Sequence, residues 1–188
     1  MKLYCATTSA GKLREFHLAG LDVAVLPGLP GISAVEETGA TFEENAILKA
    51  RYYAQFADGP LFADDSGLEV DALGGAPGIF SARYAGPSAT DAQNNAHLLQ
   101  SLQGIPKRQA RFVCVLALVD GDRVLGTFRG EVAGEILEAP RGAGGFGYDP
   151  LFWYAPLGRS FGELSNEQKF AVSHRGQALR LLKKASGS

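Results

Sequence analysis

The sequence predicts an α/β fold, and three observations support this prediction. The chain opens with an apolar strand-like run, a polar turn and a short helical stretch, all within residues 2–18. A helical segment with a capping signal follows at 41–56. Two long strand-like runs, 111–119 and 123–137, are joined by Asp120-Gly121-Asp122, a short hairpin signal. Strands and helices that mix along one chain in this way are typical of α/β proteins.

The first elements can be placed from their local signals. Lys2–Thr7 reads as a strand, and a helix is expected over 11–18, where Gly20 would end it as the residue after the cap. Asp22–Leu26 reads as a second strand. The proline- and glycine-rich segment Pro27–Gly31 is expected to be a loop.

The helix over 41–56 has the clearest signal. Thr41-Phe42-Glu43-Glu44 has the spacing of a capping box. Behind it, small and apolar residues recur at helical intervals, namely Ala46, Ile47, Ala50, Tyr53 and Ala54. Further along, we expect a loop at 74–86, a helix at 90–102, a glycine-dense loop at 140–147 and a last helix at 173–184.

Length and composition restrict the possible classes of protein. The 188 residues, 46% of them hydrophobic, suffice for one core, so we expect a single domain over 1–188. The net charge is only -2 with no basic run, so nucleic acid is not an expected partner and any anion must be bound locally. Cys5 and Cys114 lie in apolar runs and are expected to be buried free thiols. No apolar run approaches the ~18 residues that span a bilayer, so we expect a cytoplasmic protein without membrane contact.

The most informative motif is acidic. Leu61-Phe62-Ala63 runs into Asp64-Asp65-Ser66-Gly67, after which the apolar pattern resumes. Carboxylates at a strand end can hold Mg²⁺ or Mn²⁺, which prefer oxygen ligands. The alternative is a polar turn between two short strands, and for this motif alone the turn is the better interpretation.

Two segments could bind phosphate. Thr7–Lys12 lies between the first strand and the first helix, where free N–H groups and the helix dipole favour an anion, although the P-loop spacing is absent. The alternative is an ordinary N-cap with a solvated lysine. Ser173-His174-Arg175-Gly176, preceded by Lys169, begins the last helix and offers donors to an anion or a purine carbonyl. A single histidine is more often structural.

The glycine-dense loop continues into Phe146-Gly147-Tyr148-Asp149. An aromatic side chain there could stack on a base, and the acid could accept hydrogen bonds from it. The alternative, an aromatic that fills the core, is about as good for Tyr148. Asn45 and Lys49 share one helix face by their i, i+4 spacing, where they reach the site or only solvent.

Taken in order, six motifs resemble those of the inosine/xanthosine triphosphate pyrophosphatase (RdgB-like, dITP/XTP pyrophosphatase) family. Each is weak alone, but their order along nearly the whole chain is specific. The motifs are Thr7–Lys12, Glu36–Ala46, Ala63–Leu68, Gly74–Tyr84, Gly144–Phe152 and Ser173–Gly176.

The resemblance implies a two-lobed α/β fold in which a long mixed sheet floors a central cleft with helices on both sides. It implies a cytoplasmic homodimer that hydrolyses ITP, dITP and XTP to the monophosphate and pyrophosphate. The implied cofactor is Mg²⁺, with Mn²⁺ as an alternative. Glu36 and Asp65 would be metal-linked, and Asp65 would act as base on the attacking water. The implied substrate-binding residues are Thr7, Thr8, Ser9, Ala10, Gly11, Lys12, Ser66, Phe146, Gly147, Tyr148, Asp149, Lys169, His174 and Arg175. One departure is Thr7-Thr8-Ser9, where the family usually has Thr-Gly-Asn.

Two other functions remain open from the sequence. A Maf-like nucleotide pyrophosphatase would act on pyrimidine or modified triphosphates, and a substrate panel with dTTP, UTP and ITP distinguishes it. A binding module without catalysis would use the same glycine loops and aromatic residues, but it should carry an extensive basic face, which the balanced charges do not provide.

Overall fold

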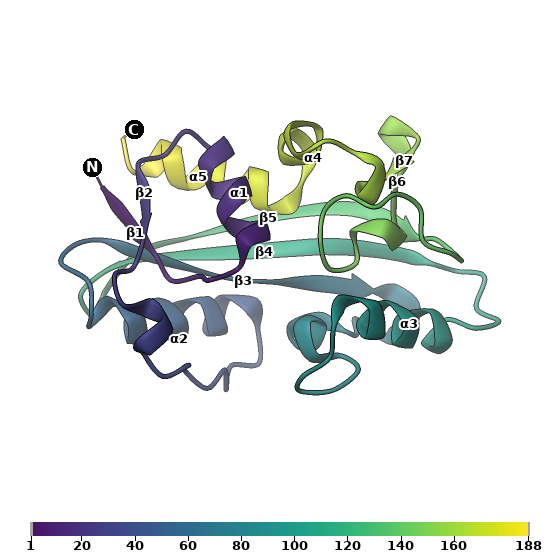
Figure 1. Cartoon of the computed structure of the whole chain (residues 1–188), viewed down its shortest axis with the longest axis horizontal. Coiled ribbons are helices and arrows are strands. Elements are labelled where there is room, and N and C mark those ends of the chain that lie inside the picture. The colour runs from purple at the N-terminus through teal and green to yellow at the C-terminus, as the bar shows by residue number, and fades with distance from the viewer. Residues whose placement is uncertain (1, 188) are drawn as a thin grey trace. The chain divides into compact units, whose positions relative to one another are not determined.

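A mixed β-sheet runs through the chain. The computed structural model describes residues 2–187, and within them seven strands pair in the order β2-β1-β3-β4-β5-β6-β7. β1 is parallel to β2 and to β3, whereas β6 is antiparallel to β5 and to β7. Helices cover the strands (Figure 1). The predicted α/β class and mixed sheet are therefore confirmed.

The strands and helices have the following bounds. The strands are β1 (Leu3–Cys5), β2 (Val23–Val25), β3 (Leu61–Val70), β4 (Gln109–Asp120), β5 (Arg123–Ile136), β6 (Phe152–Tyr154) and β7 (Arg159–Ser160). The α-helices are α1 (Ala10–Leu18), α2 (Phe42–Ala54), α3 (Asp91–Ser101), α4 (Asn166–Val172) and α5 (His174–Ala185). Short 3₁₀ helices include η2 (Asp71–Leu73) and η3 (Gly78–Arg83).

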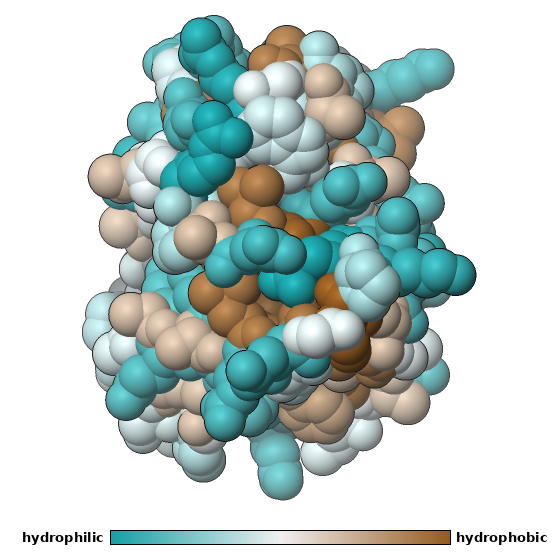
Figure 2. Space-filling view, turned by 90° about the vertical axis from the view of Figure 1, so that its right-hand side faces the viewer, coloured by the Kyte–Doolittle hydropathy of each residue, from teal (hydrophilic) through white to brown (hydrophobic). Residues whose placement is uncertain are grey.

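The chain divides into two compact units. Unit 1 comprises residues 2–65, 114–130 and 174–187, and unit 2 comprises 66–113 and 131–173. In unit 1, α1 and α5 lie on one side of the strands and α2 lies on the other (Figure 1). Figure 2 shows a face at the α3, β6 and β7 end of unit 2, where hydrophilic side chains surround a central group of apolar ones.

Helix starts follow the signals in the sequence. Ser9, Thr41 and Thr90 each cap their helix by accepting a hydrogen bond from the backbone N–H three residues on. At α2 the Glu44 carboxylate reaches back to the N–H of Ala40, one residue before the position that a capping box uses. The predicted helices at 11–18, 41–56, 90–102 and 173–184 are confirmed within two residues at each end.

Other segments differ from expectation. The predicted strand end or turn at Asp64–Gly67 is wrong, because these residues continue β3 without a break. Segment 74–86, predicted as a loop, contains the six-residue 3₁₀ helix η3, and the rest of it is turn and loop. The seven-residue helix α4 and the short strands β6 and β7 were not predicted. Strands of two or three residues show no alternation that the sequence could reveal.

Each unit has a buried interior. In unit 2, Phe112, Phe152 and Phe161 pack with ring centroids 4.5–5.9 Å apart inside the apolar core. In unit 1, Phe16 and Phe62 meet edge to face. Cys5 and Cys114 are both buried and free, as predicted. None of the helices in residues 2–187 has the length and apolar character needed to cross a bilayer.

Candidate active site

Strand β3 carries the two acidic residues to opposite sides of the sheet. The register of β1 on β3 ends at Cys5 opposite Phe62, so Asp64 and Asp65 lie just past the end of their β1 neighbour. Successive side chains of a strand point to opposite faces. Asp64 contacts cations from α1 and α5, whereas Asp65 contacts a cation from α2. The two adjacent carboxylates therefore belong to two different clusters.

The first cluster surrounds Asp64. Lys12 Nζ lies 2.9 Å from Asp64 Oδ2, and Arg175 Nη2 lies 3.5 Å from the same atom. Arg175 Nη1 also donates to Glu15 Oε2 at 2.6 Å. Burial alone would raise the pKa of Asp64, but the charges of Lys12, Arg175 and Lys49 outweigh burial and lower it. Asp64 is therefore an ionised hub that fixes Lys12 and Arg175.

Arg175 reaches this cluster because α5 approaches β5 closely. A Cβ atom at Gly130 of β5 would collide with the carbonyl oxygen of His174 and lie 2.8 Å from the nitrogen of Ala178. Only glycine leaves room for the first turn of α5 at this point. Arg175 is 2% exposed. Burial lowers its pKa, and Glu15, the leading opposing group, raises it above the usual value together with Cys114 and Asp64.

The second cluster surrounds Asp65. Lys49 Nζ lies 3.0 Å from Asp65 Oδ1 and 3.2 Å from Glu37 Oε1. Burial raises the pKa of Asp65 above its ordinary value of 3.8; Lys49 opposes the shift, and Glu37 and Asp64 add to it. The other oxygen, Asp65 Oδ2, is buried with no hydrogen-bond partner among the described residues. Such an acceptor costs free energy unless something binds it.

The predicted phosphate segment is only partly engaged. The Thr7 hydroxyl accepts from the N–H of Ser9, and Ser9 caps α1 by accepting from the N–H of Lys12. This confirms the ordinary N-cap interpretation for Ser9. Lys12, however, is paired with Asp64 rather than only solvated. Thr8 and Ala10 are exposed, and Gly11 is buried. Phosphate binding by this segment stays a prediction.

Sequence reasoning left three of the clustered residues without a role. Glu15, Glu37 and Lys49 all contact the acidic strand or its partners, whereas Glu36, the residue predicted to be metal-linked, is exposed. For Lys49 the sequence shows a helix face shared with Asn45 but not what that face contacts. For Glu15 the sequence shows only an acid within the first helix, six residues after the N-cap Ser9. The role of Glu36 stays a prediction.

In unit 2 the glycine loop is organised around Asp149. Its Oδ2 accepts from the N–H of Phe146 at 2.8 Å and from Lys169 Nζ at 2.5 Å. Lys169 is 3% exposed, and its Nζ lies 4.3 Å from the ring centroid of Phe146. Tyr148 is buried, and its hydroxyl donates to the carbonyl of Ser81 at 2.7 Å. Tyr148 thus fills the core, whereas the half-buried Phe146 remains the candidate for base stacking.

The remaining predicted residues are placed as follows. Ser66 is half-buried in β3, and His174 is 4% exposed at the start of α5. Gly147 is held by α3 through both of its backbone groups. Substrate contact by Ser66, His174 and Arg175 stays a prediction, since Arg175 directs its guanidinium to Glu15 and Asp64.

A Gly145→Ala variant should lose folding stability. Gly145 has φ +72°, and an added Cβ would collide with the Asp149 carboxylate that binds Lys169. Backbone strain and the displaced buried carboxylate together should lower the free energy of unfolding by about 2–4 kcal/mol. Gly158→Ala is the matched control, because φ is +59° and the space around it is open. Urea denaturation compares the two, and equal losses would show that Asp149 does not depend on Gly145.

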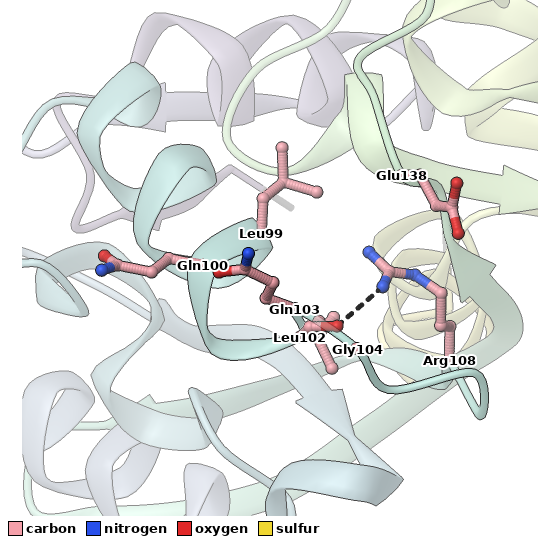
Figure 3. A pocket seen from close by; sticks show the side chains of 7 residues that line it. All are labelled: Leu99, Gln100, Leu102, Gln103, Gly104, Arg108 and Glu138. Atoms are coloured by element: carbon pink, nitrogen blue, oxygen red, sulfur yellow. Dashed lines mark hydrogen bonds between the residues drawn. The ribbon is translucent and has the colours of Figure 1, made fainter.

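Unit 2 also has a pocket of about 410 Å³ that contains none of these residues. In Figure 3, Leu99 and Gln100 come from the end of α3 and Gln103 from the turn that follows it, and Arg108 and Glu138 lie across from them. Arg108 donates to the carbonyls of Leu102, Ile105, Ile136 and Leu137 at 2.8–3.4 Å. Its guanidinium therefore connects the segment after α3 to the end of β5, which is a structural role.

Comparison with known proteins identifies the family. A sequence model described as the Ham1 family matches residues 3–185. The chain belongs to the Ham1 family. Among the relatives within it, a dITP/XTP pyrophosphatase of Yersinia pseudotuberculosis is 53% identical, over 96% of this chain and 95% of that protein. A dITP/XTP pyrophosphatase of Acidobacterium capsulatum is 47% identical, over 97% of this chain and 96% of that protein.

Solved Ham1 structures share the fold. The Ham1 protein of Staphylococcus aureus has a TM-score of 0.89 and 42% identity, covering 100% of this chain and 98% of that one. A Ham1 protein of Coxiella burnetii has a TM-score of 0.89 and 40% identity, with the same coverage. The family resemblance and fold class predicted from the ordered motifs are thereby confirmed.

Proposed function

We propose that this protein hydrolyses deaminated purine nucleoside triphosphates, ITP, dITP and XTP, to the nucleoside monophosphate and pyrophosphate. Support comes from Ham1-family relatives named dITP/XTP pyrophosphatase that match nearly the whole chain at about half identity. The observation that carries the proposal in this chain is Asp65, a buried carboxylate with a raised pKa and one unpartnered oxygen. Such a group suits a general base.

A divalent cation, Mg²⁺ or Mn²⁺, fits the Asp65 cluster. Asp65 and Glu37 carry two negative charges against the one positive charge of Lys49, so the cluster has a net negative charge that a divalent cation would balance. Residues 2–187 hold no group of three or more His, Cys, Asp or Glu side chains placed for a metal. Mg²⁺ commonly uses only one or two carboxylates, with waters and substrate phosphates as its other ligands. When bound, the ion would neutralise charge on the phosphates.

The residues then have distinct roles. Asp65 accepts a proton from the attacking water on Oδ2, the oxygen without a partner. The water oxygen bonds to the α-phosphorus, and the bond to the pyrophosphate oxygen breaks. Lys49 holds the Asp65 carboxylate in place through Oδ1. Lys12, held by Asp64, and the start of α1 bind phosphate oxygens. Phe146 stacks on the base.

Product analysis tests the reaction. Incubation with ITP and Mg²⁺ should release IMP and pyrophosphate, because the α–β anhydride is the bond that is cleaved. Release of IDP and orthophosphate would contradict the assigned bond. A panel with dTTP and UTP separates this function from that of a Maf-like pyrophosphatase, which would favour the pyrimidine substrates.

The pH dependence of kcat/KM should move in opposite directions in two variants. The Asp65 carboxylate must be ionised to act as base, so activity falls as pH drops through its pKa. Lys49→Met removes the charge that lowers the pKa of Asp65 and should move the acidic limb to higher pH. Glu37→Gln removes a charge that raises it and should move the limb to lower pH. Profiles at one fixed, saturating Mg²⁺ concentration check both shifts, and unmoved limbs would show that another group titrates.

We also propose that the protein works as a cytoplasmic homodimer, on the family resemblance alone. Sedimentation velocity at micromolar concentration should give about twice the 19.9 kDa chain mass. A single species of chain mass would contradict the dimer.

A further inference from the structure

Helix α3 holds the glycine loop of unit 2 by the two backbone groups of one residue, Gly147. The N–H of Gly147 donates to Asp91 Oδ2 at 2.7 Å, and the carbonyl of Gly147 accepts from Asn95 Nδ2 at 3.0 Å. Asp91 and Asn95 are four residues apart and so lie on one face of α3. Both backbone groups of a single loop residue are thus bound by two side chains of one helix.

Asp91 and Asn95 together form a clamp on Gly147, and helix α3, which carries this clamp, is itself fixed. Thr90 and Gln93 form a complete capping box at its start. The buried Asn94 accepts from the N–H of Ala85 at 2.8 Å and donates to the carbonyl of Ala82 at 3.1 Å. Asp91 and Asn95 therefore project from a helix end that is fixed by the capping box and by the hydrogen bonds of Asn94.

The loop needs such support because its sequence provides little. Gly145 and Gly147 both have positive φ, and glycine leaves the backbone free to adopt many conformations. Phe146 lies between them. Its own N–H is held by Asp149, and the next residue, Tyr148, is held through its hydroxyl by Ser81. Gly147 lies between these two anchors, and Asp91 and Asn95 fix its N–H and its carbonyl.

We propose that Asp91 and Asn95 are positioning residues that hold the Phe146 ring in place and thereby set the affinity for the base end of the nucleotide. The inference rests on the proposed function, in which Phe146 stacks on the base. A ring that is already ordered binds a base without first losing loop freedom. Neither residue needs to touch the nucleotide for this effect.

Binding of IMP and of pyrophosphate separates positioning from general damage. In calorimetric titrations with Mg²⁺, Asn95→Ala and Asp91→Ala should each raise the Kd of IMP by roughly 5- to 20-fold, because each removes one hydrogen bond from the loop. The Kd of pyrophosphate, which has no base, should change less than about twofold. Asp91→Asn keeps an oxygen that can accept from the Gly147 N–H and should restore most of the affinity for IMP. Gln100→Ala, an exposed residue of the same helix, is the control and should bind IMP normally.

Other outcomes would overturn the inference. Unchanged IMP binding in both alanine variants would show that the clamp does not position Phe146. Equal losses for IMP and pyrophosphate, with no rescue by Asp91→Asn, would indicate a structural role only. If the unaltered protein releases no IMP from ITP, the proposed function fails and the inference falls with it; normal product release with unaltered IMP binding in the variants rejects the inference alone.

Discussion

An Asp65→Asn variant should fold normally and lose roughly 10²- to 10⁴-fold in kcat, the range that a positioned general base contributes. The amide keeps the shape of the side chain but cannot accept a proton from water. Lys49 Nζ, 3.0 Å from Asp65 Oδ1, retains an oxygen partner in the variant and still pairs with Glu37. Steady-state hydrolysis of ITP, with the melting temperature measured in parallel, checks both parts of the expectation.

Asp120→Asn provides the control for Asp65→Asn. Asp120 is an exposed carboxylate at the end of β4, also in unit 1, and its loss should leave kcat unchanged. Turnover of Asp65→Asn within twofold of the unaltered protein would remove Asp65 from the chemistry. A large fall in melting temperature would instead make the lost activity a folding effect.

The largest loss of stability is expected for Glu15→Leu. Glu15 is 4% exposed and binds Arg175, which is 2% exposed, at 2.6 Å. Removing one member of a buried ion pair leaves the other charge uncompensated, which typically lowers the free energy of unfolding by about 3–5 kcal/mol. Asp64 compensates Arg175 only in part, at 3.5 Å, and it also serves Lys12. Urea denaturation measures the loss.

A second ion pair of the same length provides the control for Glu15→Leu. Glu69 and Arg111 also meet at 2.6 Å, but the Arg111 side chain is 48% exposed. Glu69→Leu should change the free energy of unfolding by about 1 kcal/mol or less, because water screens an exposed pair. The double variant Glu15→Leu/Arg175→Met should recover part of the stability by removing the orphaned charge. Equal losses in the free energy of unfolding at the two pairs would show that burial does not determine how much each pair contributes to stability.

The sequence predicted what local signals determine. Ser9, Thr41 and Thr90 mark helix starts because a side-chain cap depends only on the next three residues. The ordered motifs identified the family for the same reason, since each is a short run. The break predicted at Asp64–Gly67 was wrong because β3 continues through these residues beside β4, and strand pairing overrides their turn preference.

Contacts between residues that are far apart in the sequence could not be predicted from local motifs. Glu15 and Arg175 are separated by 160 positions in the chain, and nothing near either residue indicates the other. Their meeting depends on Gly130, a third distant residue that lets α5 approach β5. Likewise Lys49 had a visible helix face, but only the fold shows that the face meets Asp65 and Glu37.

The separation of Asp64 and Asp65 across the sheet also protects the alignment of β3. A slip of this strand by one residue would bring either Ala63 into the position of Asp64 or Ser66 into the position of Asp65. In the first case Lys12 and Arg175 lose the Asp64 carboxylate, and in the second case Lys49 loses the Asp65 carboxylate. Only the observed register of β3 gives both clusters their carboxylate. Single-residue insertions or deletions within residues 61–65 should therefore be tolerated far less than those in the Asp120–Arg123 hairpin turn.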